Sequence, residues 1–158
     1  GGIDKPGVYL DETVMRMCYT HRRLLSQLAM NLIQEGDTVR AKQVLDKMEK
    51  EIPDYNVRHD YQSGSLDIVR AYALTGQDQK AQELLDRLWK KSSQYLQWYC
   101  SFDGNSFDIS QRDCMLHIYL MQQMLDVQDV ISEEQADKKQ KQLEGFMRIY
   151  QSKGGSWD

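Results

Sequence analysis

The chain is poor in the residues that interrupt helices. Only two of its 158 residues are proline, Pro6 and Pro53. No stretch alternates polar and apolar residues for long enough to indicate a β-strand. Leu, Gln, Lys, Met and Asp are frequent instead, and most of them favour helices. The composition therefore predicts an all-α fold of about six helices.

Long apolar runs are also missing. No run approaches the roughly 18 apolar residues that a membrane-spanning helix needs, and no secretion signal stands at the N-terminus. The chain begins GGIDKPG, where Gly1 looks like a remnant of a removed tag. We therefore expect an excised piece of a longer protein, with residues 1–10 as an extended leader and residues 153–158 as a disordered tail.

The charge and the motifs exclude several classes of function. A net charge of -4 does not provide the basic surface that nucleic acids require. The three histidines lack the spacing of metal ligands. The sequence also contains no nucleotide-binding loop and no hydrolase nucleophile motif. We expect no catalytic residue, no metal, no cofactor and no nucleic-acid partner for this chain.

The three cysteines do not form a C-x-x-C pair, and an odd number cannot pair completely within one chain. Buried free thiols are the simplest expectation. The residues between Cys100 and Cys114 look like a loop that would turn the chain back, so a disulfide between these two remains open.

The chain does contain an internal repeat. Residues 35–53 read EGDTVRAKQVLDKMEKEIP, and residues 75–93 read TGQDQKAQELLDRLWKKSS. The glycine, the alanine and one Leu-Asp pair recur at the same places. A repeated helix–turn–helix unit predicts hairpins that stack and bury their faces against each other.

The repeat has the spacing of the tetratricopeptide pattern. The first unit supplies Leu25, Leu28, Ala29, Leu32, Gly36, Ala41, Leu45, Met48 and Pro53, and the second supplies Ile68, Tyr72, Gly76, Ala81, Leu85 and Leu88. The second unit departs from the pattern at Val69 and Ser93, and its period is 40 residues instead of 34. We expect one tetratricopeptide-like, right-handed domain over residues 11–152, with an unrelated helical bundle as the alternative. Its repeats would span about 22–55 and 62–95, and a capping hairpin about 110–152.

Local signals set the expected ends of the helices. Asp11 is an N-cap candidate for a first helix that ends before Gly36. Further helices are expected over about 38–51, 65–75 and from 78 onward. Ser110 is the expected cap of a fifth helix that reaches about Val130, and Ser132 with Gln135 predicts a capping box for the sixth.

The candidate binding residues lie in the first helix and in the connector between the repeats. Arg16, Tyr19 and Arg23 fall at i, i+3 and i+7 and share one helix face. Asp60 and Tyr61 lie in the connector 54–64. One interpretation is that Arg16, Tyr19 and Arg23 clamp an anion or a peptide carboxylate, with Asp60 and Tyr61 as further binding candidates. The alternative is structural, with the arginines paired to acids such as Asp11, Glu12 or Asp60. The structural interpretation of the connector is that it packs against the hairpins and that Asp60 or Ser63 caps the next helix.

An aromatic cluster also stands out, formed by Trp89, Tyr95, Trp98 and Tyr99. Such side chains are usually core residues. If they are exposed, they could bind sugar rings or another protein domain.

Two stretches, YLDETVMRMCYTHRR (9–23) and YNVRHDYQSGSLDIVRAY (55–72), resemble a known family. They are similar to the C-terminal region of large multi-spanning membrane proteins from Bacteroidetes, whose membrane half looks like protein O-mannosyltransferase-type glycosyltransferases. The resemblance implies a domain in the periplasm, on a parent in the bacterial inner membrane. The catalytic acid of such enzymes lies in the membrane half, so no catalytic residue carries over to this chain.

Two hypotheses for the function follow. In the first, the chain is a non-catalytic interaction or accessory domain that binds an acceptor polypeptide or docks on its own membrane domain. In the second, it contributes directly to a carbohydrate or lipid-phosphate binding site of the transferase.

Overall fold

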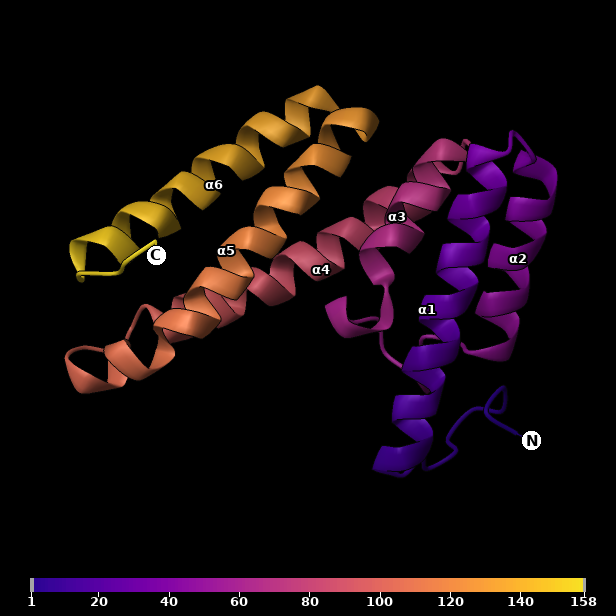
Figure 1. Ribbon diagram of the computed structural model, residues 1–158, viewed down its shortest axis with the longest axis horizontal. Helices are drawn as coiled ribbons and strands as arrows, with labels where there is room; N and C mark the ends of the chain where they lie inside the picture. The colour runs from indigo at the N-terminus through magenta and orange to yellow at the C-terminus, as the bar shows by residue number, and fades with distance from the viewer. Residues whose placement is uncertain (1, 158) are drawn as a thin grey trace. The chain divides into compact units, whose positions relative to one another are not determined.

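A computed structural model describes residues 2–157, and these residues form six α-helices and one short 3-10 helix (Figure 1). The elements are α1 (Glu12–Gln34), α2 (Thr38–Glu51), η1 (Tyr61–Ser63), α3 (Ser65–Leu74), α4 (Asp78–Tyr99), α5 (Asn105–Ile131) and α6 (Glu133–Ser152). The predicted all-α class with about six helices is confirmed. Gly1, interpreted above as a tag remnant, and Asp158 lie outside the described residues.

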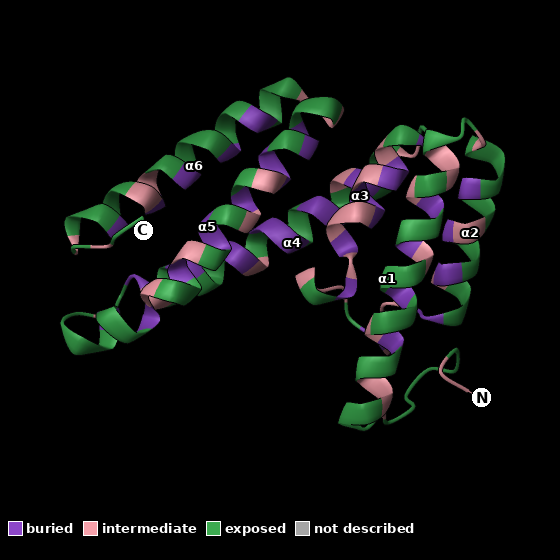
Figure 2. Ribbon diagram, viewed as in Figure 1, coloured by how far each residue is buried: buried purple, intermediate pink, exposed green. Residues whose placement is uncertain are grey.

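The chain forms two compact units, each described by itself below. Unit 1 is Gly1–Leu84 and unit 2 is Leu85–Asp158, so the division falls within the sequence of α4. In both units, buried residues recur along each helix between exposed ones (Figure 2). This is the pattern expected of helices that pack with one face.

In unit 1, α1 packs against α2, α3 and η1, and Figure 1 shows α1 and α2 side by side. Ala29 of α1 and Ala41 of α2 are completely buried, as expected where small residues let two helices approach. Leu45 and Met48 are buried beside them. Leu28, which the repeat pattern places with the packing residues, is instead 45% exposed.

The two glycine turns of the repeat have the same geometry. Gly36 and Gly76 have φ values of 80° and 74°, a region that glycine occupies without the strain a side chain would add. In both turns the backbone N–H of the next residue donates to the carbonyl five residues earlier, at 2.8 Å. Ala41 and Ala81, five residues beyond each glycine, are both fully buried. The two glycine turns therefore share one local geometry.

The starts of the helices agree with the sequence at some sites and not at others. The Asp11 carboxylate accepts a hydrogen bond from the Val14 N–H at 2.9 Å, so the predicted cap of α1 is confirmed. The prediction that Ser110 caps the fifth helix is wrong, because α5 begins at Asn105. The Ser110 hydroxyl donates within the helix to the Ser106 carbonyl at 2.9 Å, and burial of Phe107 holds the extra turn.

The predicted capping box at the start of α6 is also wrong. Ser132 occupies the N-cap position with extended backbone, but its side chain makes no capping hydrogen bond. Its N–H donates to the Gln128 carbonyl at 2.8 Å, and its own carbonyl accepts from Ala136 at 3.1 Å. The tight passage from α5 to α6 therefore relies on the backbone of Ser132.

In unit 2, α5 packs against α6, and α4 continues to Tyr99 without a break. Side chains from the three helices join through polar contacts. The Trp89 indole N–H donates to the Gln142 amide oxygen at 2.8 Å. The Lys139 ammonium, almost buried, donates to the Asp86 carboxylate at 2.6 Å and to the Gln128 amide oxygen at 2.9 Å.

Both ends of the described chain make contacts. The Asn56 amide donates to the carbonyls of Ile3 and Lys5 at 2.7 and 2.6 Å, and residues 3–7 form turns in place of the expected extended leader. In the expected disordered tail, the Gly155 N–H donates to the Tyr150 carbonyl at 3.0 Å, and the Trp157 ring packs on Tyr150.

Candidate functional site

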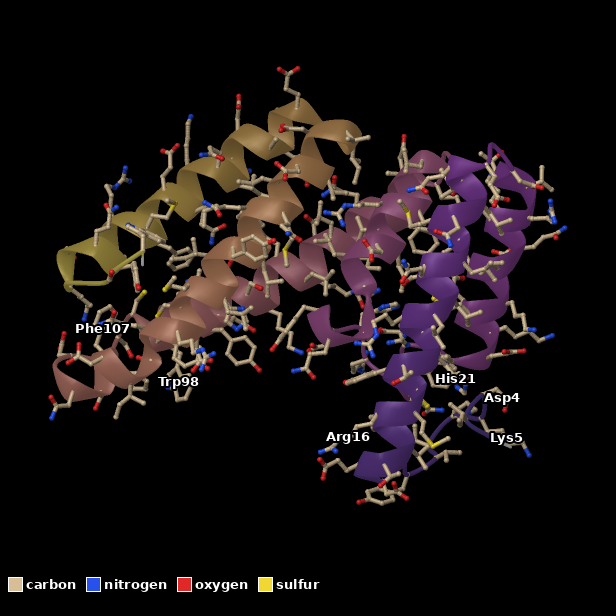
Figure 3. The ribbon with its side chains drawn as sticks, viewed as in Figure 1. Asp4, Lys5, Arg16, His21, Trp98 and Phe107 are labelled. Carbon is tan, nitrogen blue, oxygen red and sulfur yellow. The ribbon has the colours of Figure 1, made fainter. Side chains whose placement is uncertain are left out.

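The three predicted residues of α1 lie in different surroundings. Arg16 is exposed and pairs with Glu12 at 2.5 Å, one of the partners considered in the structural alternative. Figure 3 shows Arg16 and His21 on different sides of α1. Tyr19 is half-buried and packs against the small cluster of Cys18, Ile52 and Val57.

The two predicted residues of the connector serve its local structure. Asp60 is the N-cap of η1, with its carboxylate accepting from the Gln62 N–H at 3.0 Å and its own N–H donating to the Ser63 hydroxyl at 3.2 Å. Tyr61 is half-buried, and its hydroxyl accepts from the Gln62 amide at 3.2 Å.

Of the three predicted residues of α1, Arg23 contacts the connector, and the contact is made by its backbone. A Cβ placed on Gly64 would lie 3.2 Å from the Arg23 Cα and 2.8 Å from the Ser26 hydroxyl oxygen. The end of η1 therefore lies directly on α1 at this turn. The Arg23 side chain is exposed. The structure thus joins Arg23 to the segment that carries Asp60 and Tyr61, and leaves Arg16 about two turns away along the helix.

The sequence reasoning missed Arg22, which is completely buried in unit 1. Its guanidinium donates to the carbonyl oxygens of Val57 at 2.6 Å, Ile52 at 2.8 Å and Arg58 at 3.2 Å. One cation thus binds three backbone acceptors, one at the end of α2 and two in the connector. The signal in the sequence is positional: residue 22 lies four after Cys18 and four before Ser26, both of which are buried on the inner face of α1.

The surroundings of Arg22 explain its electrostatics. Burial lowers the pKa of the Arg22 guanidinium from its ordinary value, and the nearby Asp54 carboxylate acts in the opposite direction. Its Nε makes no hydrogen bond. Asp54 itself holds the connector, since it accepts from the His59 N–H at 2.9 Å and pairs with Arg58 at 3.3 Å. Arg22 therefore has a structural position and does not reach solvent.

The exposed face of α1 is more apolar than the sequence suggested. Met17, Leu24 and Leu28 are 57%, 60% and 45% exposed, although the repeat pattern predicts Leu28 as a packing residue. Their spacing of seven and four residues places them on one stripe. Arg16 and Arg23 lie along one side of this stripe. We call Met17, Leu24 and Leu28 the α1 stripe.

In unit 2 the aromatic cluster is partly exposed. Trp89 is buried, as expected of a core residue, whereas Trp98 is 56% exposed. The Trp98 ring contacts the rings of Tyr99 and Phe102, with centroids 5.0 and 5.1 Å apart. Tyr95 stacks on the buried His117 ring at 4.7 Å. Four aromatic rings thus follow one another from the second half of α4 into the next loop. We call them the α4 ring row: Tyr95, Trp98, Tyr99 and Phe102.

A shallow hollow of about 670 Å³ lies at the start of α6. Its lining carries both signs of charge and consists of Ser132, Glu134, Gln135, Asp137, Lys138, Lys139 and Lys141. Lys139 already donates to Asp86 and Gln128. The mixed lining does not select an ion of one charge.

Two further findings concern the described residues 2–157 as a whole. No three His, Cys, Asp or Glu side chains gather there as ligands of a metal ion would. None of the helices is both long enough and apolar enough to cross a membrane.

Comparisons with known proteins assign neither a family nor a function to the chain. No protein-family model matches the chain, and neither the curated proteins nor the solved structures include a match.

Proposed function

We propose that this chain is a non-catalytic accessory domain that binds a polypeptide through the exposed face of α1. The observation that carries the proposal is the α1 stripe. These three large apolar side chains are exposed to solvent at helical spacing. The other faces of the same helix pack on α2, α3 and η1. Exposed apolar side chains that gather in one place are typical of interaction sites.

The repeat supports the same proposal. The matched turns at Gly36 and Gly76, and the buried alanines that follow them, agree with a tetratricopeptide-like array of hairpins. Each hairpin of such an array buries one side against its neighbour and presents another to a ligand. In this proposal the first helix supplies the presented face.

The chemistry of α1 indicates the partner. An amphipathic helix laid along the α1 stripe would bury its apolar side chains against Met17, Leu24 and Leu28. Arg23 stands at the edge of the stripe and would favour an acidic partner. Arg16 contributes less, because Glu12 already neutralises it. The preferred ligand is therefore an acidic amphipathic segment of an acceptor polypeptide or of the parent protein.

The resemblance to glycosyltransferase-like membrane proteins suggests what the parent is. If it holds, the α1 stripe docks this domain on its own membrane half or on an acceptor polypeptide in the periplasm. The full-length coding sequence tests this part directly, because membrane-spanning segments upstream are required by the proposal.

A second candidate function rests on the α4 ring row. Exposed Trp and Tyr rings stack on the apolar faces of sugars, so Trp98 and its neighbours would suit a carbohydrate that the parent processes. This candidate corresponds to a direct contribution to the carbohydrate or lipid-phosphate site of the transferase.

Calorimetric titration with two synthetic helices tests the main proposal. One carries leucines on one face and glutamates beside them, and the other replaces the glutamates with lysines. We expect the acidic helix to bind more tightly. Leu24→Ser should weaken it about tenfold or more, because a buried leucine contributes roughly 1.5–3 kcal/mol. Arg23→Ala should remove the preference for acid.

Val39→Ser is the matched control, because Val39 has a similar exposure, 68% against 60% for Leu24, but lies on α2. It should leave the binding unchanged. Equal binding by the wild type and Leu24→Ser would rule out the α1 stripe. Binding of an oligosaccharide that Trp98→Ala abolishes would instead support the second candidate.

A further inference from the structure

Residues 2–7 of the chain form a compact segment at the surface of unit 1. The Lys5 N–H donates to the Gly2 carbonyl at 3.0 Å, which is the hydrogen bond of a β-turn over residues 2–5. A second turn follows at Pro6 and Gly7, where Gly7 has a φ of 76°. The side chains of residues 4–9 are exposed. We call residues 2–7 the leader turn.

Two adjacent side chains of the connector bind the leader turn through its backbone. The Asn56 amide donates to the Ile3 carbonyl at 2.7 Å and to the Lys5 carbonyl at 2.6 Å. The Tyr55 hydroxyl donates to the Asp4 carbonyl at 2.5 Å. Three successive carbonyls are thus bound, one from each residue. Because all three acceptors are main-chain atoms, a turn of another sequence offers the same acceptors.

One side chain of the leader turn is bound as well. Ile3 is partly buried and packs against the apolar cluster of Cys18, Ile52 and Val57, whose members are at most 7% exposed. The site therefore selects an aliphatic side chain at the second position of a β-turn and accepts exposed residues at the next two positions. It lies apart from the α1 stripe, because Cys18 is on the buried face of α1 and the stripe is on the exposed face.

We propose that Tyr55, Asn56 and this apolar cluster form a peptide-binding site, which the chain's own leader turn fills in this structure. The partner is a polypeptide segment that forms a β-turn with Ile, Leu or Val at its second position. A segment with few buried contacts opens locally at low cost, so the leader turn can leave the site. It competes with the partner because its tether keeps its effective concentration high. The site does not depend on the function proposed for the α1 stripe.

Calorimetric titration of the full chain with a synthetic peptide of residues 2–10, GIDKPGVYL, tests the proposal. Ile3→Ser in the chain weakens the hold on the leader turn and leaves the site unchanged. This variant should bind the peptide about tenfold or more tightly than the wild type, in which the tethered copy competes. The same peptide with serine in place of its isoleucine is the control and should not bind. Equal binding of GIDKPGVYL by the wild type and by Ile3→Ser, or no binding to either, would overturn the proposal.

A second peptide tests whether the site recognises main-chain atoms. GISSPGSSS keeps the isoleucine and the turn residues and replaces every other side chain with serine. It should bind to Ile3→Ser within about threefold of the first peptide, because the acceptors are main-chain carbonyls. Binding of GIDKPGVYL alone would mean that the site serves only this chain's own segment, and would rule out a partner of other sequence.

Substitution of the donors identifies the site. In the Ile3→Ser background, Asn56→Asp replaces the amide donor with an acceptor of the same shape and should weaken the peptide about tenfold or more, since two carbonyls lose their donor. Tyr55→Phe removes one hydroxyl and should have a smaller effect. Circular dichroism checks that both variants are folded. Unchanged binding by Asn56→Asp would contradict the assignment.

The cysteines give a second readout in the same variants. Cys18, Cys100 and Cys114 are all buried and free, so the disulfide left open by the sequence is not formed. Cys18 belongs to the cluster that Ile3 packs against, whereas the other two lie in unit 2. Alkylation of the native protein by iodoacetamide, followed by peptide mapping, should modify Cys18 faster in Ile3→Ser than in the wild type. Added GIDKPGVYL should slow it again, with Cys100 and Cys114 unaffected. No protection of Cys18 by the peptide would count against the site.

Discussion

Unit 1 and unit 2 each bury one long basic side chain, but they satisfy it in different ways. In unit 1 the Arg22 guanidinium donates to three backbone carbonyls, those of Ile52 at the end of α2 and of Val57 and Arg58 in the connector. In unit 2 the Lys139 ammonium donates to two side chains, the Asp86 carboxylate of α4 and the Gln128 amide of α5. Arginine suits the first task because its planar group offers several donors in fixed directions.

The difference shows what each cation holds in place. Backbone carbonyls cannot turn away without moving the chain, so Arg22 fixes the path of residues 52–58. Side-chain acceptors can rotate, and Asp86 is already 51% exposed on its side chain. Lys139 therefore links three helices without determining the backbone of any of them. Removal of the cation should cost more stability in unit 1.

The largest effect is expected for Arg22→Met. This change keeps a long side chain but leaves three carbonyls without their donor, and each buried unsatisfied acceptor costs about 1–3 kcal/mol. We expect the free energy of unfolding to fall by about 3–5 kcal/mol, as judged by urea denaturation. Arg23→Met is the control, because Arg23 is the next residue in the sequence and its side chain is exposed. This variant should change the free energy of unfolding by less than about 0.5 kcal/mol. Similar losses for the two variants would show that Arg22 does not hold the connector.

A smaller effect is expected for Lys139→Met. Gln128 then loses a donor in the interior, while Asp86 can turn to water, so the loss should be about 1–3 kcal/mol. The same urea denaturation measures it, and Lys138→Met on the exposed side of α6 provides the control. A loss larger than that of Arg22→Met would reverse the comparison between the units.

The smallest effects concern the helix caps. Asp11→Ala removes a carboxylate that accepts from Val14 and should cost about 1 kcal/mol. Ser132→Ala removes a hydroxyl that makes no capping bond and should cost less than about 0.5 kcal/mol. Thermal melts of the two variants under the same conditions compare them. Equal shifts would mean that the Ser132 hydroxyl does cap α6 in solution.

The parts of the fold that depend on local sequence were predictable. The turns at Gly36 and Gly76 were found because a left-handed residue and a small packing residue recur at fixed spacing. The start of α5 was missed because it depends on Gly104, which has a φ of 54°, and on the burial of Phe107 by distant residues. A hydroxyl such as that of Ser110 suits a cap and a helix interior alike.

The candidate site was predictable only in outline. The sequence pointed to α1 and the connector, and the structure does place Gly64 against Arg23. The sequence alone does not distinguish the buried Arg22 from the exposed Arg23. Charged residues are usually exposed, and the buried face of α1 was identified from its apolar residues. The exposure of Met17, Leu24 and Leu28 depends on what packs beside α1, which their own spacing does not reveal.

Gly64 also has a consequence for how this sequence can diverge. Gly36 and Gly76 face open space, so asparagine, which tolerates a left-handed backbone, is an acceptable replacement there. Gly64 has a φ of 72° and lies against the backbone of Arg23, so any side chain would meet both backbone strain and a fixed neighbour. Among distant relatives that keep this fold, we expect the two repeat glycines to drift while Gly64 remains, which makes it the better marker of common descent.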